Sequence, residues 1–211
     1  MIRIFLIDDH AVVREGYRRL LERRPDLRVE AEAGSAEEAL QRLRGGNADA
    51  DVIVLDLSLP DMGGIELIQR IAQRQPQARM LAFSMHRDPL FATQALRAGA
   101  LGYVTKSSSP DVLIDAIYRI ARGEKVLSPD IAPGIALSLM ERDGNPLGTL
   151  SPREFEILRL LLDGQGAEQI GNTLSISPKT VQNGHYQIKA KLGVKSDIEL
   201  TRLAVKLKLI A

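Results

Sequence analysis

Short apolar runs alternate with helical patterns through the first half of the chain, and this alternation limits the fold more than any other feature of the sequence. Each run is short and aliphatic, which is typical of strands buried on both faces of a parallel sheet. Strands separated by helices predict right-handed βαβ units in a doubly wound α/β fold with five strands in the order 2-1-3-4-5. The expected strands are residues 3–7, 28–33, 52–56, 80–84 and 101–105, and the expected helices are residues 10–24, 36–44, 64–74, 88–98 and 110–122.

Polar residues stand at the ends of four of these apolar runs. Asp8 and Asp9 follow the first run and Asp56 follows the third, while Ser84 ends the fourth and Lys106 follows the fifth. Ligands of open α/β sheets bind at the carboxyl ends of the strands, so we expect these side chains to converge. Three carboxylates, a hydroxyl and an ammonium in one pocket could hold a divalent cation and a phosphoryl group.

This set of groups suits the formation of an acyl phosphate. Asp56 is the candidate nucleophile toward phosphorus, and Mg²⁺ would neutralise the repulsion between the two anions. Asp8 and Asp9 are the candidate metal-holding residues, with Asp9 as the direct ligand. Lys106 would pair with a phosphoryl oxygen, and Ser84 would donate a hydrogen bond to it. Each acid alone could instead be an ordinary loop or capping residue, but that reading does not explain all four strand ends.

The second half of the chain has a different organisation. Residues 123–148 are interrupted by prolines and glycines and are interpreted as a linker between domains 1–122 and 149–211. A short helix is expected within the linker at about residues 131–141, where Ile131, Ile135, Leu139 and Met140 could share a face.

The C-terminal segment has helical patterns and no strand pattern. Serine caps and Ser-Pro pairs start its helices, and Gly164 and Gly193 are expected to stop two of them. Residues 149–211 carry nine Lys and Arg against six acids, and residues 176–196 hold four lysines and no acid. Short helices with a basic third helix predict a helix-turn-helix domain that binds DNA.

Three motifs of the first half resemble the receiver domain of two-component response regulators. They are Ile7–Gly16, Val54–Pro60 and Gly102–Lys106, and the Asp-Asp-His form of the first is typical of the NarL/FixJ subfamily. The resemblance implies a flavodoxin-like fold and phosphorylation of Asp56 by a sensor histidine kinase. It also implies that Mg²⁺ is bound by Asp9, Asp56 and the main-chain carbonyl of Ser58.

The resemblance also implies a switch. In the family, the hydroxyl on the fourth strand moves toward the phosphoryl group and an aromatic residue on the fifth strand swings inward behind it. Here these residues are Ser84 and Tyr103. The alternative for Tyr103 is an aromatic residue that only packs in the core.

The C-terminal motifs Thr149–Glu154, Ile176–Val181 and Lys191–Val194 resemble the LuxR-type helix-turn-helix domain, with a recognition helix at about residues 178–192. Its N-terminal part is expected to enter the major groove. Amide side chains can read adenine edges, and lysines are suited to phosphates, although each lysine could also lie on a solvated helix face. The candidate DNA contacts are Lys179, Thr180, Gln182, Asn183, Tyr186, Lys189 and Lys191.

Two residues and one loop depart from the patterns of the resembled families. Gly184 lies inside the recognition helix, where it could allow close approach to DNA or to a neighbouring helix, or could loosen the helix at a cost of about 1 kcal/mol. His185 falls on the apolar side of that helix and is interpreted as a packed histidine, so base specificity is not carried over. The loop 60–64 reads Pro-Asp-Met-Gly-Gly in place of Pro-Gly-Met-Asp-Gly, which is expected to alter turn chemistry rather than phosphoryl chemistry.

The last predicted helix, at about residues 196–208, carries Leu203 and Leu207 beyond what a small domain must bury. In the resembled family this helix pairs two domains over a two-fold operator, which implies a homodimer on DNA and RNA polymerase as a further partner. The alternative is that both leucines pack against the first helix of the same domain.

Composition and motif spacing weigh against other classes of protein. The chain has no cysteine, which excludes disulfides and thiolate metal sites. It has no apolar run of about 20 residues and no signal peptide, so a cytoplasmic protein without membrane contact is expected. Ser58 stands where a haloacid-dehalogenase-type phosphatase needs a second acid. A dinucleotide-binding site would need a glycine-rich turn after the first strand, and Asp8-Asp9-His10-Ala11 stands there instead. We therefore expect a DNA-binding regulator rather than an enzyme, with a regulator that acts by protein contact alone as the alternative.

Overall fold

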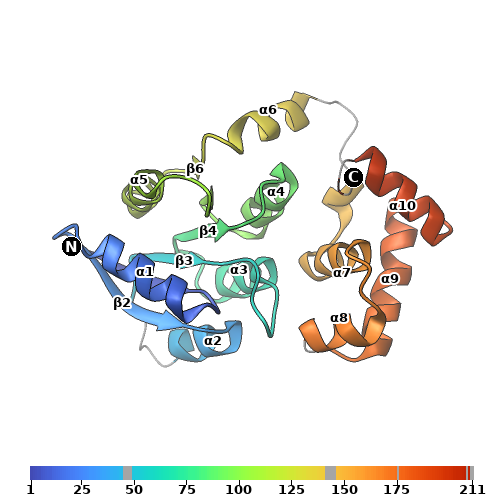
Figure 1. The fold of residues 1–211 in the computed structure, drawn as a ribbon, viewed down its shortest axis with the longest axis horizontal. Coiled ribbons are helices and arrows are strands. Elements are labelled where there is room, and N and C mark those ends of the chain that lie inside the picture. Colours follow the sequence, from blue (N-terminus) through green and yellow to red (C-terminus); the bar gives the residue numbers. More distant parts are fainter. Residues whose placement is uncertain (45–48, 141–145, 175, 208, 210–211) are drawn as a thin grey trace. The chain divides into compact units, whose positions relative to one another are not determined.

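The computed structural model describes residues 1–44, 49–140, 146–174, 176–207 and 209. The chain divides into two compact units, Met1–Met140 and Glu141–Ala211, each of which is described by itself (Figure 1). Among the residues that the structure describes, no helix has both the length and the apolar character needed to span a bilayer.

A parallel sheet forms the centre of the first unit, with strand order β2-β1-β3-β4-β5-β6. The predicted parallel fold and the order of its first five strands are confirmed. The predicted count of five was wrong, because a two-residue sixth strand pairs with β5; its run of two apolar residues is too short to be recognised as a strand. The strands are β1 (Ile2–Ile7), β2 (Leu27–Ala33), β3 (Val52–Leu55), β4 (Met80–Ser84), β5 (Gly102–Thr105) and β6 (Val126–Leu127).

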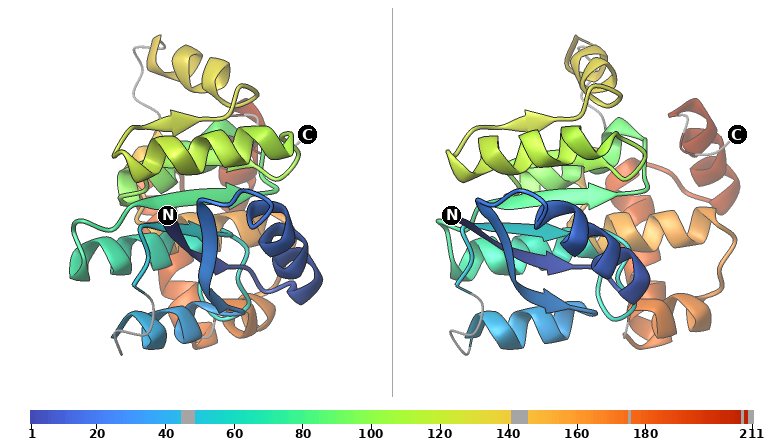
Figure 2. Two further views of the ribbon diagram at one scale, coloured as in Figure 1. Left: turned by 90° about the vertical axis from the view of Figure 1, so that its left-hand side faces the viewer. Right: turned by 60° about the vertical axis from the view of Figure 1, so that its left-hand side comes forward.

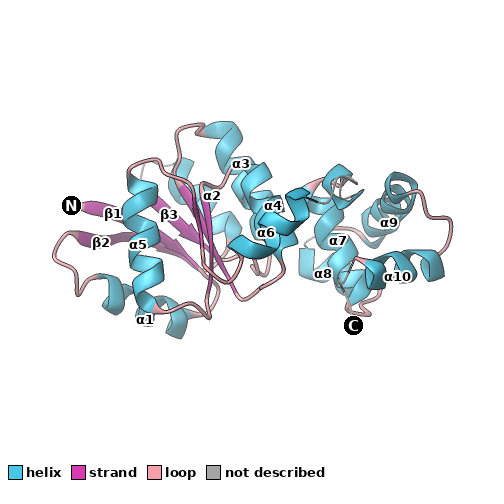
Figure 3. Ribbon diagram, turned by 90° about the horizontal axis from the view of Figure 1, so that it is seen from above, coloured by secondary structure: helices cyan, strands magenta, loops and turns pink. Residues whose placement is uncertain are grey.

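Helices cover both faces of this sheet, with α1 and α5 on one face and α2, α3 and α4 on the other (Figures 2 and 3). The face beneath α1 and α5 is a continuous apolar core that includes Leu6, Val54, Phe83, Val104 and Ile117. Burial on both faces explains why β3 and β4 are apolar at successive positions instead of alternating. The helices are α1 (Ala11–Leu21), α2 (Ala36–Arg44), α3 (Gly64–Arg74), α4 (Pro89–Ala98) and α5 (Pro110–Ala121).

Glycines follow the ends of two helices in this unit, and a serine at the start of one of them does not act as a side-chain cap. Gly99 and Gly123 lie just past α4 and α5 with φ of 120° and 81°, which glycine adopts without a steric penalty. Ser109 occupies the N-cap of α5, but its hydroxyl accepts no hydrogen bond from the helix. The Val112 amide donates instead to the Ser109 carbonyl, at 3.0 Å.

Much of the predicted linker is packed against the first unit. The Ser128 amide donates to the Tyr103 carbonyl at 2.9 Å, which continues the pairing of β6 with β5. Helix α6 (Ala132–Met140) follows, and its Gly134 lies so close to Pro89 of α4 that a Cβ atom would be 2.2 Å from the proline Cγ. Ile131 and Ile135 are buried as their shared face predicts, and the side chains of residues 139 and 140 lie outside the described residues.

The described residues of the second unit form helices joined by short connecting segments, with no strand among them. Phe155 and Leu158 of the first α-helix pack in a core with Ile170, Val181 and Ile188 from the next two helices. Its elements are the 3₁₀-helix η1 (Pro146–Thr149), α7 (Pro152–Leu162), α8 (Ala167–Leu174), α9 (Pro178–Leu192) and α10 (Asp197–Lys206).

Gly184 allows close packing of α9 against α7. A Cβ atom at this position would lie 2.7 Å from Cδ1 of the buried Ile157, so the side chain is absent where the two helices approach each other. Of the alternatives left open by the sequence, the structure supports approach to a neighbouring helix.

The exposed apolar side chains of α10 differ from those expected. Leu203 and Leu207 are only partly exposed, whereas Ile198 is 68% and Val205 49% exposed. The expectation of two exposed leucines was therefore wrong.

Gly64→Ala is expected to destabilise the first unit by about 3 kcal/mol, at the upper end of the range for overpacking. The added Cβ would lie 2.4 Å from the Asp56 carbonyl oxygen and 2.4 Å from the Leu57 Cα, and backbone atoms have no free rotamer. Gly16→Ala is the control: it adds a Cβ to α1 with no atom within 4 Å, so stability should rise by about 0.5–1 kcal/mol. Urea unfolding of both variants measures the difference, and equal midpoints would contradict the assignment.

Candidate functional site

The sheet brings the predicted polar residues together by continuing its hydrogen-bond ladders past the strand ends. The Asp8 amide donates to the Ala33 carbonyl, and the Asp56 amide donates to the Ile7 carbonyl at 2.9 Å. The Lys106 amide donates to the Ser84 carbonyl at 2.8 Å. Adjacent strands therefore hold these backbone positions at one edge of the sheet.

Lys106 links two carboxylates at this edge. Its Nζ lies 2.5 Å from Asp8 Oδ2 and 2.6 Å from Asp56 Oδ2. Asp8 and Asp56 are 3% and 4% exposed, and charges so far removed from water need partners. The ion pair across three strands is therefore the electrostatic centre of the unit.

Burial and charge act against each other on the pKa values of this cluster. Burial raises the pKa of the Asp56 carboxyl above its ordinary value, while the Lys106 ammonium and the Ser58 amide oppose that shift. Burial lowers the pKa of Lys106, but the adjacent Asp56 and Asp8 carboxylates outweigh it and the net shift is upward. Lys106 therefore stays charged at neutral pH and holds the two carboxylates together.

The third carboxylate has free coordinating capacity. Asp9 Oδ1 is a buried atom that accepts no hydrogen bond within the described structure, although His10 Nδ1 lies 2.8 Å away. Ligand atoms of Asp8, Asp9 and His10 all lie within 4.8 Å of one another. Clustered carboxylate oxygens with an unsatisfied buried oxygen fit a hard divalent cation.

Ser84 and Tyr103 meet around the segment that follows β4. Ser84 is completely buried, and its hydroxyl accepts a hydrogen bond from the His86 amide at 3.3 Å. The Tyr103 hydroxyl donates to the His86 carbonyl at 2.8 Å, and burial raises the pKa of this phenol above its ordinary value. In this structure Tyr103 is thus already turned inward.

Sequence reasoning missed two residues at this edge. His86 Nε2 lies 3.4 Å from the Ser58 hydroxyl, and its ring stacks on Phe91 with centroids 4.0 Å apart. Its position two residues beyond the end of β4 was a signal that could have found it. Arg14 donates hydrogen bonds to the Asp8 carbonyl and to the Glu32 carboxylate. The second bond joins α1 to β2, and no local sequence motif predicts it.

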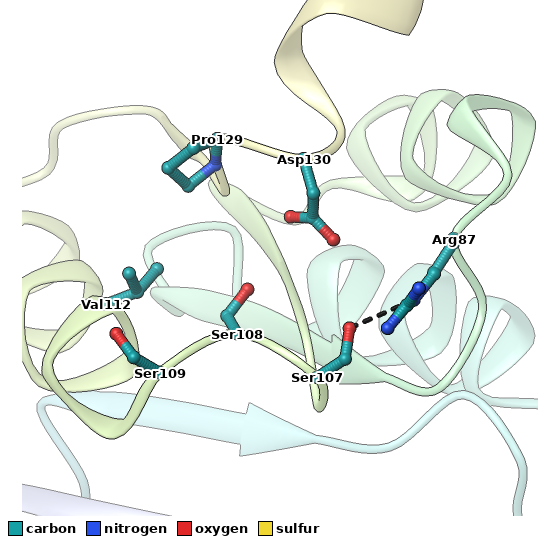
Figure 4. A pocket seen from close by; sticks show the side chains of 7 residues that line it. All are labelled: Arg87, Ser107, Ser108, Ser109, Val112, Pro129 and Asp130. Carbon is teal, nitrogen blue, oxygen red and sulfur yellow. Dashed lines mark hydrogen bonds between the residues drawn. The ribbon is translucent and has the colours of Figure 1, made fainter.

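A separate cavity of about 520 Å³ opens beside β5 (Figure 4). Arg87 Nε donates to the Ser107 hydroxyl across it at 3.1 Å, and Asp130 on its rim accepts a hydrogen bond from Thr105. Its lining contains none of the three clustered carboxylates. Charge and geometry, rather than cavity size, therefore identify the candidate site. The lining residues are Arg87, Ser107, Ser108, Ser109, Val112, Pro129 and Asp130.

In the second unit, α9 presents a polar face with the predicted periodicity. Val181 and Ile188 are buried, while Lys179, Gln182 and Asn183 are exposed. Tyr186 lies on the same α-helix with 69% exposure. Thr180 is exposed too, and its hydroxyl lies 2.8 Å from that of Ser177, the N-cap residue.

The remaining candidate DNA contacts are engaged in ion pairs. Lys189 Nζ and His185 Nε2 both lie 2.9 Å from Asp197 Oδ1, at the start of α10. Lys191 Nζ lies 2.6 Å from Glu154, which also completes the capping box of α7. His185 is thus a packed and paired side chain, as interpreted from the sequence. These ion pairs connect the C-terminal half of α9 to α7 and α10. The polar residues in the N-terminal half of α9 remain exposed to solvent.

Comparison with known proteins agrees with this geometry. Residues 4–118 match the family described as "Response regulator receiver domain", and residues 148–204 match "Bacterial regulatory proteins, luxR family". The chain belongs to the NarL/FixJ response regulators. It therefore combines a receiver domain with a LuxR-type DNA-binding domain, as the sequence motifs suggested.

Full-length relatives of this response regulator have similar sequences. The transcriptional regulatory protein UhpA of Escherichia coli K12 is 40% identical over 202 residues, covering 96% of this chain and 97% of UhpA. The response regulator UvrY of the same strain is 35% identical over 208 residues, covering 98% of this chain and 94% of UvrY. RcsB of Salmonella enterica serovar Typhimurium, solved bound to promoter P1flhDC with the phosphomimetic BeF₃⁻, matches with a TM-score of 0.69 at 27% identity, covering 95% of this chain and 96% of RcsB.

Lys106→Met is expected to raise the pKa of the Asp56 carboxyl further, because it removes the cation that opposes the effect of burial. Between the unfolded-state pKa of about 3.9 and a higher folded-state pKa, the folded protein binds more protons than the unfolded chain. Stability therefore falls as pH rises through that window, and the variant should lose stability over a wider range above about pH 4.

Carboxyl ¹³C NMR titration in metal-free buffer measures this shift. Lys125→Met, which removes an exposed lysine of the same unit, is the control and should leave the titration of Asp56 unchanged. A Lys106→Met protein whose Asp56 titrates as in the wild type would show that the ion pair does not control this carboxylate.

Proposed function

We propose that this response regulator is switched by transfer of a phosphoryl group to Asp56, and that the modified protein controls transcription through α9. The observation that carries the proposal is the buried cluster in which Lys106 Nζ lies 2.6 Å from the Asp56 carboxylate and 2.5 Å from Asp8, which in turn has a carboxylate oxygen within 4.8 Å of one of Asp9. A nucleophile, a fixed cation and a carboxylate with spare coordinating capacity are the groups that phosphoryl transfer to a carboxylate needs.

In the proposed reaction, an Asp56 carboxylate oxygen forms a bond to phosphorus as the bond from phosphorus to the donor nitrogen breaks. The donor would be the phosphorylated histidine of a sensor kinase. Its imidazole nitrogen is the leaving group and keeps the electron pair of the broken bond. Lys106 would then pair with a phosphoryl oxygen, and the Ser58 amide would stay near Asp56 Oδ1, where it already lies at 3.1 Å. The chain supplies a nucleophile and positioned charge, while the donor supplies the reactive bond.

We assign the metal-holding role to Asp9, Asp56 and the main-chain carbonyl of Ser58, with Asp8 completing the acidic cluster. Mg²⁺, when bound there, would neutralise the negative charge that accumulates between carboxylate and phosphoryl oxygens. Asp8 supports the site differently, because its carboxylate is already paired with Lys106 and so holds the ammonium beside Asp56.

The switch would begin with the new negative charge on Asp56. Phosphoryl oxygens are strong hydrogen-bond acceptors, and Ser84 is the strand-end hydroxyl predicted to move toward them. Ser84 accepts from the His86 amide, and Tyr103 donates to the His86 carbonyl, so a shift of Ser84 is passed to the aromatic ring through one residue. The shift would bias an existing equilibrium rather than create a new state.

DNA binding is assigned to the exposed face of α9. Lys179 and Thr180 suit phosphates at the N-terminal end of the helix, and Gln182, Asn183 and Tyr186 suit base edges. RcsB structures contain DNA-bound protein, including two dimers on two DNAs, and by analogy we propose a homodimer on a two-fold operator. Ile198 and Val205 are the exposed apolar residues available for pairing, and RNA polymerase is the expected further partner.

Regulation by protein contact alone gains no support from the structure. A recognition helix loosened by Gly184 would have favoured it, but this glycine lies against Ile157 of α7. The proposed domain limits stay at 1–122 and 149–211 around the linker 123–148, with β6 and α6 in the part of the linker that packs on the first unit.

Asp56→Asn is expected to abolish labelling by a small phosphodonor such as acetyl phosphate, because the amide cannot form the acyl phosphate. Phosphate-affinity gel electrophoresis of the full chain with Mg²⁺ measures the labelled fraction. Asp115→Asn, which neutralises an exposed acid on α5, is the control and should be labelled like the wild type. Equal labelling of the Asp56 variant would place the acceptor elsewhere.

Lys179→Ala is expected to weaken binding to specific and random duplexes alike, since a phosphate contact carries no sequence information. Losing one such contact should reduce the slope of log affinity against log salt by about 1. Gel-shift titrations at several salt concentrations measure both quantities. Lys125→Ala removes the same charge from the other unit, and an equal effect of the two variants would mean that net charge alone was responsible.

A further inference from the structure

The loop that follows Asp56 is tied to a distant helix by a carboxylate that the phosphorylation chemistry leaves without a role. We propose that Asp61 is a positioning residue that preorganises the metal-binding loop by capping helix α2. The proposal rests on the proposed function, because it concerns how the Ser58 carbonyl is held for the metal ion.

Both oxygens of Asp61 accept hydrogen bonds from the first amides of α2. Oδ1 accepts from the Ala36 amide at 3.0 Å, and Oδ2 accepts from the Glu37 amide at 2.7 Å. These amides have no partner within the helix, and the N-terminus attracts negative charge. A carboxylate from a separate loop therefore satisfies two orphan donors at once.

The other cap of α2 is local. The Ser35 hydroxyl accepts from the Glu38 amide at 3.2 Å, and the Glu38 carboxylate accepts from the Gly34 amide at 2.8 Å. Ser35 and Asp61 thus bond to different amides of the same helix end. The Asp61 bonds join that helix to the loop after β3 and the Ser35 bond does not, so the two caps can be separated by mutation.

The loop is also held at its ends. The Gly64 amide donates to the Leu57 carbonyl at 2.9 Å, and the Ser58 amide donates to Asp56 Oδ1 at 3.1 Å. Leu57 and Leu59 are buried, on either side of the exposed Ser58. Asp61 lies in the loop between Leu59 and the start of α3. Its bonds to α2 hold the part of the loop that follows the proposed Ser58 carbonyl ligand.

The unusual residue order of this loop is explained by the same contact. In the more usual order, Pro-Gly-Met-Asp-Gly, the acid would stand at position 63, which is the N-cap of α3. Gly63 occupies that cap here without a side-chain hydrogen bond, while the acid at position 61 caps α2. Moving the acid by two residues therefore exchanges a local cap for a link between two elements.

A fixed loop favours metal binding through entropy. A carbonyl ligand on a mobile loop must be immobilised when the ion binds, which reduces affinity, whereas a loop anchored beforehand does not incur that loss. Residues that orient metal ligands without touching the ion commonly change affinity by about 10-fold or more. Asp61 is therefore expected to act on metal affinity as well as on stability.

Isothermal titration of the full chain with MgCl₂ tests the proposal. Asp61→Ala should weaken Mg²⁺ binding about 10-fold, and Asp61→Asn, which retains one acceptor oxygen, should weaken it less. Ser35→Ala is the matched control: it removes a cap from the same helix end and should lower the melting temperature without changing Mg²⁺ affinity. Amide hydrogen exchange at Ser58, measured without metal, should accelerate in Asp61→Ala and stay unchanged in Ser35→Ala.

The outcomes separate this proposal from the proposed function. Wild-type affinity in both Asp61 variants, or an equal loss of affinity in Ser35→Ala, would overturn the positioning role and leave the metal site intact. A wild-type protein that binds no Mg²⁺, or an Asp9→Asn variant that binds it normally, would refute the metal site and with it the role of Asp61. Should Asp61→Ala fail to fold, the nearly isosteric Asp61→Asn carries the same test.

Discussion

The receiver unit depends on one buried interaction, in which the Lys106 ammonium lies between the carboxylates of Asp8 and Asp56. Removing Lys106 would leave two buried carboxylates without their shared cation, and this is costly in a medium of low polarity. The three residues follow three different strands, so the ion pair forms only when the sheet has its native order. Site and fold therefore depend on each other, and a cation beside Asp56 is present before any phosphoryl group arrives.

The segments around this centre are held by backbone contacts rather than by side-chain packing alone. Gly64 brings the start of α3 against the backbone of Asp56 and Leu57, at a distance that no side chain could tolerate. His86 connects Ser84 to Tyr103 through its amide and its carbonyl. A change in charge at one carboxylate would thus act on loops whose positions are already defined, as the proposed switch requires.

The DNA-binding unit uses its charges in two ways. Lys189 and Lys191 are paired with Asp197 and Glu154, and these pairs join α9 to α10 and α7. Lys179 and the polar residues after it remain exposed at the other end of α9. An acid-free stretch of sequence therefore contains both structural and surface lysines, and only the positions of acids elsewhere in the chain distinguish the two groups.

The sequence by itself determined the alternation of strands and helices, the polar residues at the strand ends and the helix-turn-helix pattern, because hydrophobic periodicity and capping act over a few residues. The tertiary structure alone decided the sixth strand, the approach of Gly184 to Ile157, the exposure of Ile198 instead of Leu203, and the cap that Asp61 provides for α2. The sixth strand, the Gly184 contact and the Asp61 cap each join residues that are distant in the sequence. Such contacts depend on how whole helices and strands pack against one another, and a local sequence pattern does not identify the residue that packing places in contact.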